Sequence, residues 1–276
     1  MSGFGGAGAF SDGKLSLSYE VGGDLPTLIG EMFAQELINY TDSIYLEFGA
    51  DSHIEGINAS EEVKEIRKRA IQAGLKLVDC PIRHLGTEKS HELYKKIQDY
   101  LLANNVEIMF DTNVKDLIVE NNKVSGVIIS PSGSTDSSQD VELSSETVIL
   151  GIGRKGAHWL SEMCAKHQIK NRAGVVDVGV RYELPDSVMK DVNEYLYEGK
   201  FIFNTSVGTQ VRTFCSNPSG HVVVENYDGV VNVNGHSYND SKLCSENTNF
   251  ALLVSHHFDE PFNKPNEYAH KVSSLA

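Results

Sequence analysis

The chain has 276 residues, of which 40% are hydrophobic and 22% charged, which is ordinary for a folded protein with one or two domains. Its 24 basic and 38 acidic side chains leave a net charge of −14, which argues against nucleic acid and anionic membranes as partners because both need a basic surface. The sequence has neither an apolar run of membrane-spanning length nor a secretory signal, so the expected location is the cytoplasm.

The first informative stretch is GFGGAGAFSDGKL at residues 3–15. Glycine reaches positive φ without steric cost, and backbone N–H groups in such a loop can surround an anion. The stretch therefore suits a phosphate or another flat, charged ligand, and the alternative is a flexible N-terminal tail. The candidate binding residues in it are Gly5, Gly6, Ala7, Gly8, Ser11, Asp12 and Lys14.

Two helices are expected next. Residues 16–60 hold one helix, with Pro26 near its first turn, and then a short strand or turn that ends at Gly49. A second helix covers residues 60–73, because Ser60 is a good N-cap and acidic residues fill the first turn.

The following segment contains a candidate proton-transfer residue. A short strand near residues 75–78 leads into a loop at 84–87, and an amphipathic helix follows from residue 91. His84 is a candidate for proton transfer or for anion binding, because imidazole titrates near neutral pH. The alternative is a histidine that only hydrogen-bonds the loop backbone.

The middle of the chain is predicted to form β-strands. We expect a strand at 106–110, a hairpin over 114–129 that turns at Asn121-Asn122, a short strand at 141–143 and a buried apolar strand at 147–150. A continuous apolar strand is typical of a parallel sheet, in which ligands lie at the carboxyl ends of the strands. The residues at that end are Gly151, Gly153 and Arg154, and the arginine either pairs with a phosphate or carboxylate or lies on the surface.

The second half begins with a helix at 158–169 and becomes rich in strands. Apolar and polar residues alternate over 175–184, and turns are expected at Pro218-Ser219-Gly220 and at Asn234-Gly235. Arginine, histidine and asparagine side chains here can together hold a carboxylate or carbonyl group. The residues singled out are Arg181, Cys215, His236, Ser237 and Asn249.

The four cysteines show neither C-x-x-C nor zinc-finger spacing, so we expect reduced thiols and no metal site. They are Cys80, Cys164, Cys215 and Cys244. The alternative is a redox dithiol, for which no sequence feature pairs two of them.

Several stretches resemble one known family. GFGGAGAFSDGKL is similar to the G-x-G-G-A-G-x-F-S-D-G-K-L element of FAD-dependent dehydrogenases described as NAD(FAD)-utilising. Further stretches resemble elements of the same family in the same order: HLGTEK at 84–89, GIGR at 151–154, DVGVRYE at 177–183, TFCSNPSGHVV at 213–223, VNGHSY at 233–238 and NTNFALL at 247–253. The resemblance covers nearly the whole chain.

The resemblance implies an α/β fold. Residues 1–156 would form part of a Rossmann-type FAD-binding domain of the two-dinucleotide kind, and residues 157–276 a β-rich α+β domain. In this family the glycine-rich element follows a G-x-G-x-x-G fingerprint that this sequence lacks. We therefore expect the chain to be an internal portion of a larger flavoprotein, or a shortened relative of one.

The resemblance also implies a function. FAD would be the cofactor, with NAD(P) as an optional electron partner, and the protein would move a hydride or electrons between flavin and an unidentified organic substrate. Residues 3–14 and 151–154 would border the flavin, and Asn113 and Val114 would lie at the adenosine. His84, Arg181 and His236 are the catalytic candidates. The alternatives are a non-catalytic fragment and a small-molecule binding protein without redox activity.

Overall fold

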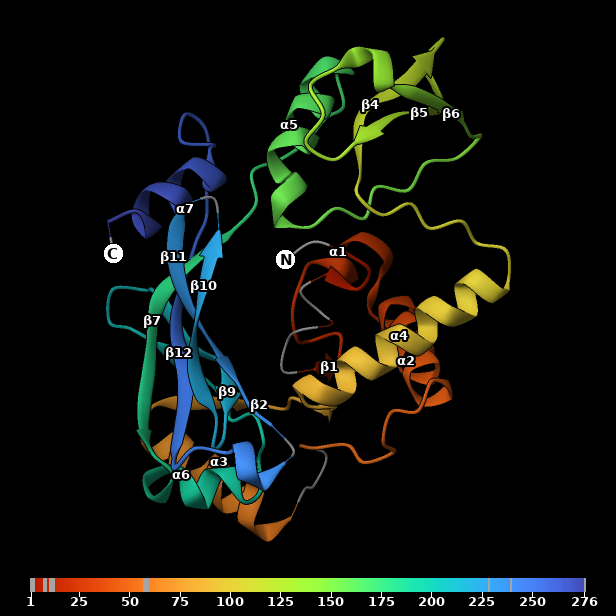
Figure 1. The fold of residues 1–276 in the computed structure, drawn as a ribbon. Coiled ribbons are helices and arrows are strands. Elements are labelled where there is room, and N and C mark those ends of the chain that lie inside the picture. The colour runs from red at the N-terminus through yellow and green to blue at the C-terminus, as the bar shows by residue number, and fades with distance from the viewer. Residues whose placement is uncertain are drawn as a thin grey trace. The chain divides into compact units, whose positions relative to one another are not determined.

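The chain is a mixed α/β protein made of two compact units (Figure 1). The computed structural model describes residues 3–6, 9, 13–56, 60–227, 229–238 and 240–275, and within its helices and strands all side chains but those of Arg154 and Tyr227. Unit 1 comprises Met1–Gln98 and Ala173–Ala276, and unit 2 comprises Asp99–Arg172. The boundary expected after residue 156 falls inside unit 2. In the ranges described there are seven α-helices, and every strand pairing is antiparallel.

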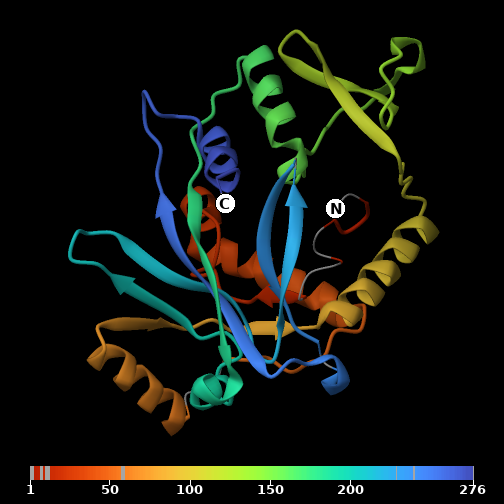
Figure 2. The same ribbon diagram turned by 60° about the vertical axis from the view of Figure 1, so that its left-hand side comes forward.

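The main sheet of unit 1 has five strands in the order β2-β8-β9-β12-β7. Their bounds are Leu75–Val78 for β2, Val176–Pro185 for β7, Lys200–Asn204 for β8, Gln210–Asn217 for β9 and Asn247–His256 for β12. Figure 2 shows that the sheet combines one strand from the first part of the chain with four from the last part. The alternation predicted over 175–184 is confirmed as strand β7.

A small apolar core joins this sheet to helix α3, which spans Glu61–Gln72. Ser60 caps the helix as predicted, since its hydroxyl accepts the Val63 N–H at 3.3 Å. The buried apolar residues of the core are Val63, Ile66, Ala70, Leu77 and Leu196. Removal of these side chains from water is the main force that holds α3 against β2. Helix α6, Asp186–Asn193, adds Val192 to the same core.

The remaining helices of unit 1 are α1 (Leu25–Ile29), α2 (Glu31–Glu47), α7 (Pro265–Ser273) and most of α4 (Thr87–Ala103). Helices α2 and α4 touch through the hydroxyls of Tyr45 and Tyr94, which lie 2.7 Å apart. Of the short strand or turn expected to end at Gly49, the strand is wrong because α2 continues through Glu47, and the turn is confirmed at residues 48–49. The single helix expected between residues 16 and 60 is instead divided at Gly30, whose φ of +86° interrupts the helix.

Two short strands bring the end of the glycine-rich element, Lys14 and Leu15, next to the segment that contains His84. Strand β1, Lys14–Ser16, pairs with β3, Ile82–His84, so that Lys14 lies opposite His84. Arg83 anchors β3 from its other side. It is buried, and its guanidinium holds both oxygens of the Asp42 carboxylate, at 2.5 and 2.7 Å. This bidentate contact fixes β3 to helix α2.

Strands β10 (His221–Tyr227) and β11 (Val230–His236) form a hairpin. The turn predicted at Pro218-Ser219-Gly220 is confirmed, since it joins β9 to β10. The turn predicted at Asn234-Gly235 is wrong: both residues lie inside β11, where Gly235 pairs with Val222. An Asn-Gly pair makes a two-residue hairpin turn only when φ is positive, and Gly229, at +82°, takes that conformation here.

Unit 2 consists of the antiparallel strands β4 (Thr112–Glu120), β5 (Lys123–Pro131) and β6 (Val141–Ser144), with helix α5 (Ala157–Lys166). The predicted hairpin turn at Asn121-Asn122 is confirmed, with φ of +51° and +60°. Helix α5 is fixed to β4 by the Trp159 indole, whose N–H donates to the Lys115 carbonyl at 2.9 Å.

Two predicted strands of unit 2 are wrong. Residues 106–110 and 147–150 have no strand conformation, and no strand in the described part of the chain pairs with them. An isolated extended segment lacks the partner backbone that makes a strand stable. Most of their apolar side chains are exposed, and Ile149 is 89% exposed. The buried parallel strand expected at 147–150 is thus not formed. As for membranes, none of the helices described is long and apolar enough to cross a bilayer.

Candidate functional site

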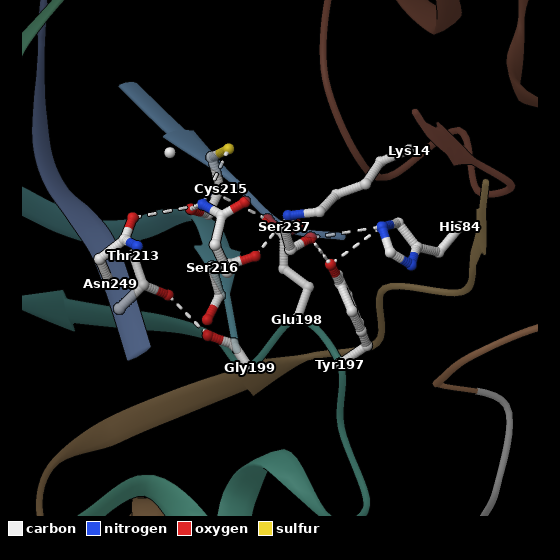
Figure 3. Close-up of polar contacts among 12 residues, drawn as sticks. Lys14, His84, Tyr197, Glu198, Gly199, Thr213, Cys215, Ser216, Ser237 and Asn249 are labelled. Atoms are coloured by element: carbon white, nitrogen blue, oxygen red, sulfur yellow. Dashed lines mark hydrogen bonds and ion pairs between the residues drawn. The ribbon is translucent and has the colours of Figure 1, made fainter. Parts of the chain in front are cut away.

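A connected group of polar side chains occupies the part of unit 1 where β1, β3, β9 and β11 approach the loop before β8 (Figure 3). Its members come from distant positions in the chain, and several lie in the stretches quoted above. They are Lys14, His84, Arg181, Tyr197, Glu198, Cys215, Asn217, Asn234, Ser237 and Asn249. We call this group the polar network.

A buried ion pair lies at the centre of the polar network. The Lys14 ammonium is 3.4 Å from the Glu198 carboxylate, and the two side chains are only 12% and 10% exposed. The same ammonium donates to the Ser216 carbonyl and lies 5.1 Å from the centre of the Tyr197 ring. Lys14 is thus held by several groups of the protein itself.

Beside the ion pair, two hydroxyls and an imidazole form a triangle. The Tyr197 hydroxyl is 3.0 Å from His84 Nε2 and hydrogen-bonded to Ser237 Oγ, which is itself 3.5 Å from the same nitrogen. The rings of His84 and Tyr197 also stack, with centroids 4.2 Å apart. Each of the three groups can both donate and accept a proton in the course of a reaction.

On the other side of the ion pair, an arginine and three asparagines form what we call the amide cluster: Arg181, Asn217, Asn234 and Asn249. Arg181 Nη1 donates to Asn249 Oδ1 at 2.6 Å, and Nη2 donates to Asn234 Oδ1 at 3.4 Å. Asn217 and Asn249 are fully buried at 0% exposure. A Cβ on Gly235 would stand 2.2 to 2.4 Å from three of these side chains, so only glycine fits beside them.

Cys215 connects the ion pair to the amide cluster. Its backbone N–H donates to Glu198 Oε1 at 3.1 Å, and its carbonyl accepts from Arg181 and Asn217 at 3.2 and 2.7 Å. These bonds hold Cys215 at a φ of +49°, a conformation that non-glycine residues rarely adopt.

The polar network includes two of the three catalytic candidates. His84 belongs to the triangle and Arg181 to the amide cluster. His236 ends strand β11 opposite His221, one residue before Ser237, and the structure gives its ring no polar bond to the network. Tyr197 and Glu198 were not predicted. They lie in EYLYEGK, which carries no recognisable motif, and only the fold brings them to Lys14.

The predicted cofactor residues fall into three groups. Gly5, Gly6 and Lys14 belong to unit 1; Val114, Gly151, Gly153 and Arg154 belong to unit 2; Ala7, Gly8, Ser11 and Asp12 lie outside the described residues. Val114 is on strand β4 opposite Ile129, next to Asn113, and Arg154 begins a short 3-10 turn.

Three of the candidate glycines have open backbone that suits a flat ligand, whereas a Cβ at Gly5 would lie only 3.0 Å from Ala9 and 3.1 Å from the Tyr94 ring. Gly6 has a φ of +50°, and none of the atoms that the structure describes lies within 4 Å of the place where its Cβ would stand. In unit 2, the Cβ positions of Gly151 and of Gly153 likewise have nothing within 4 Å. Backbone left uncovered in this way lets a cofactor approach closely. Lys14 fits the predicted role less well, because Glu198 already engages its charge.

All four cysteines are free thiols, and no metal-binding group of three or more His, Cys, Asp or Glu side chains occurs among the described residues. Burial, with a smaller contribution from the Glu198 carboxylate, raises the pKa of Cys80 to about 11. Its thiol therefore stays protonated in the folded chain while the thiol of an unfolded chain ionises near pH ~8.5. The stability that this difference contributes is complete below that pH and is lost as the pH rises towards 11.

A labelling experiment tests the state of Cys80. At about pH 8 we expect iodoacetamide to modify exposed Cys244 at an ordinary rate and Cys80 roughly a hundredfold more slowly, because the thiolate is the reactive form. Mass spectrometry of the alkylated peptides measures both rates in one sample. Equal rates would show that the Cys80 thiol is not buried and that its pKa is not raised.

The sequence was also compared with known proteins. No family model matches it, and the search of curated proteins found no match.

Proposed function

We propose that the chain is an FAD-dependent oxidoreductase, or the part of one that supports substrate chemistry, and that it moves a hydride or electrons between flavin and an organic substrate. The observation that carries the proposal is the meeting of separate motifs. Lys14, His84, Cys215, Ser237 and Asn249 come from five stretches that resemble the flavoprotein family, and all five belong to the polar network. Stretches that matched the family only by chance would not be expected to lie together in the folded chain.

The finer fold belongs to the same proposal. A Rossmann-type FAD-binding domain contains apolar parallel strands, and residues 106–110 and 147–150 have the composition of such strands.

In this proposal FAD, when bound, would supply the redox chemistry. The chain's own residues bind it and handle protons. The open backbone at Gly6 in unit 1 would face the flat ring or the pyrophosphate. His84 would hold or release a proton, and Arg181 would keep the amide cluster and Cys215 in place. NAD(P) is the electron partner that this chemistry most simply accommodates.

FAD binding by the glycine loop can be tested with a single methyl group. We expect Gly6→Ala to weaken FAD binding about tenfold, because the methyl strains a residue at positive φ and covers the open backbone. Titration of FAD with the protein, followed by flavin fluorescence, measures the affinity.

Gly208→Ala is the matched control for this experiment. Gly208 also has a positive φ, of +82°, and no atom within 4 Å of its Cβ position, but it lies in the turn between β8 and β9. The Gly208→Ala variant should bind FAD with the affinity of the wild type. Equal loss of affinity in both variants would contradict a binding role for the loop, and absence of FAD binding in the wild type would contradict the proposed function.

A further inference from the structure

We propose that Tyr197 exchanges a proton with the substrate, that His84 and Ser237 act with it, and that the substrate is an alcohol or the corresponding carbonyl compound. This inference rests on the proposed flavin function and adds to it a catalytic residue and a substrate class. The sequence contains no motif at Tyr197, so the assignment depends on geometry alone.

The first argument is the position of the Tyr197 hydroxyl. It bonds to His84 Nε2 at 3.0 Å and to Ser237 Oγ, so a proton that arrives on the phenol oxygen has a base within direct reach. Tyr197 is half-buried, whereas Ser237 is only 2% exposed. The phenol is therefore the member of the pair that a ligand from outside can reach more easily.

The second argument is the charge beneath the ring. The Lys14 ammonium lies 5.1 Å from the ring centre and is kept there by Glu198 and by the Ser216 carbonyl. This cation–π contact holds the Tyr197 ring, so that its hydroxyl keeps its place beside His84 and Ser237. Because the pair with Glu198 fixes the ammonium, the ring needs no rearrangement during the reaction.

The third argument concerns the substrate. The Tyr197 hydroxyl can accept the O–H of an alcohol and can donate to the oxygen of a carbonyl compound, while buried Ser237 holds it in place. In the oxidation direction, the substrate O–H proton passes to the Tyr197 oxygen while the phenol's own proton passes to His84 Nε2. The C–O bond would become C=O, and the hydride of that carbon would be taken up by the redox chemistry that a bound flavin supplies. Reduction follows the same path in reverse, and His84 exchanges its proton with water.

The test uses the full chain loaded with FAD. Under anaerobic conditions it is mixed with a panel of secondary alcohols and 2-hydroxy acids, and flavin bleaching is followed by absorbance. We expect at least one of these alcohols to bleach the flavin of the wild type. Tyr197→Phe should slow bleaching roughly a hundredfold while FAD retention stays the same, which is the usual effect of removing a general acid or base. Tyr195→Phe, in the same loop but exposed, should keep the wild-type rate.

A second readout does not depend on turnover. In protein labelled with ¹⁵N at histidine, the ring shifts of His84 should report Nε2 as a hydrogen-bond acceptor, and this signature should change in Tyr197→Phe but not in Tyr195→Phe. Circular dichroism shows whether each variant folds. Should Tyr197→Phe misfold, Ser237→Ala takes its place and should slow bleaching at least tenfold with FAD retained.

The outcomes separate the two proposals. A wild type that retains no FAD removes the proposed function, and this inference with it. If FAD is retained but no alcohol bleaches it, if Tyr197→Phe reacts at the wild-type rate, or if His84 does not sense the phenol, only the inference is overturned.

Discussion

Replacement of Gly235 with alanine is expected to lower the free energy of unfolding by about 3 kcal/mol. The new Cβ would lie 2.2 Å from Asn217 Nδ2, 2.3 Å from Asn249 Oδ1 and 2.4 Å from Arg181 Nη1. Both asparagines are fully buried and cannot move into solvent, so the methyl must break the hydrogen bonds of the amide cluster. Urea unfolding followed by circular dichroism measures the loss.

Gly174→Ala is the control for this prediction, since nothing lies within 4 Å of the Cβ position at Gly174. We expect its unfolding curve to overlay that of the wild type. If Gly235→Ala were as stable as Gly174→Ala, the amide cluster would not be packed against β11 as described.

Lys14→Met is expected to lower the free energy of unfolding by about 3–5 kcal/mol, because it leaves the buried Glu198 carboxylate without its partner. Restoring neutrality should recover much of that loss, so the double variant Lys14→Met/Glu198→Gln should be clearly more stable than the single variant. The same unfolding measurement applied to the wild type, both single variants and the double variant gives the coupling energy between two residues that are far apart in the sequence.

An exposed ion pair supplies the comparison. Lys64 and Glu61 are 2.7 Å apart but 60% and 85% exposed, so Lys64→Met should change stability by less than about 1 kcal/mol. A Lys14→Met variant that behaved like Lys64→Met would mean that Lys14 and Glu198 are not buried together, and the centre of the polar network would be lost.

Local signals predicted much of the fold. The Ser60 cap, the Asn121-Asn122 turn and the alternation of β7 each depend on residues within one element, and each is confirmed. The strand predictions at 106–110 and 147–150 were wrong because they depend on residues outside the element. Apolar composition indicates a strand, but a strand exists only where another backbone pairs with it, and sequence alone does not say whether one is present.

The candidate site also divides into residues that the sequence indicates and residues that only the fold brings together. His84 and Arg181 could be selected from the sequence because their side chains carry recognisable chemistry. Tyr197 and Glu198 could not, since they become functional candidates only when the fold sets them against Lys14 and His84. The Asn234-Gly235 pair misled in a related way: it has the composition of a turn, but the contacts of Gly235 with the amide cluster give that glycine a packing role.

The most direct test of the central claim, a flavin-dependent redox function, is a visible absorption spectrum of the purified chain after incubation with FAD and desalting. The proposal predicts that the bands of oxidised flavin remain with the protein and bleach when a reductant such as NADH or NADPH is added without oxygen. A protein that emerges colourless from the desalting column would contradict it, and the polar network would then be a binding or structural feature of another kind.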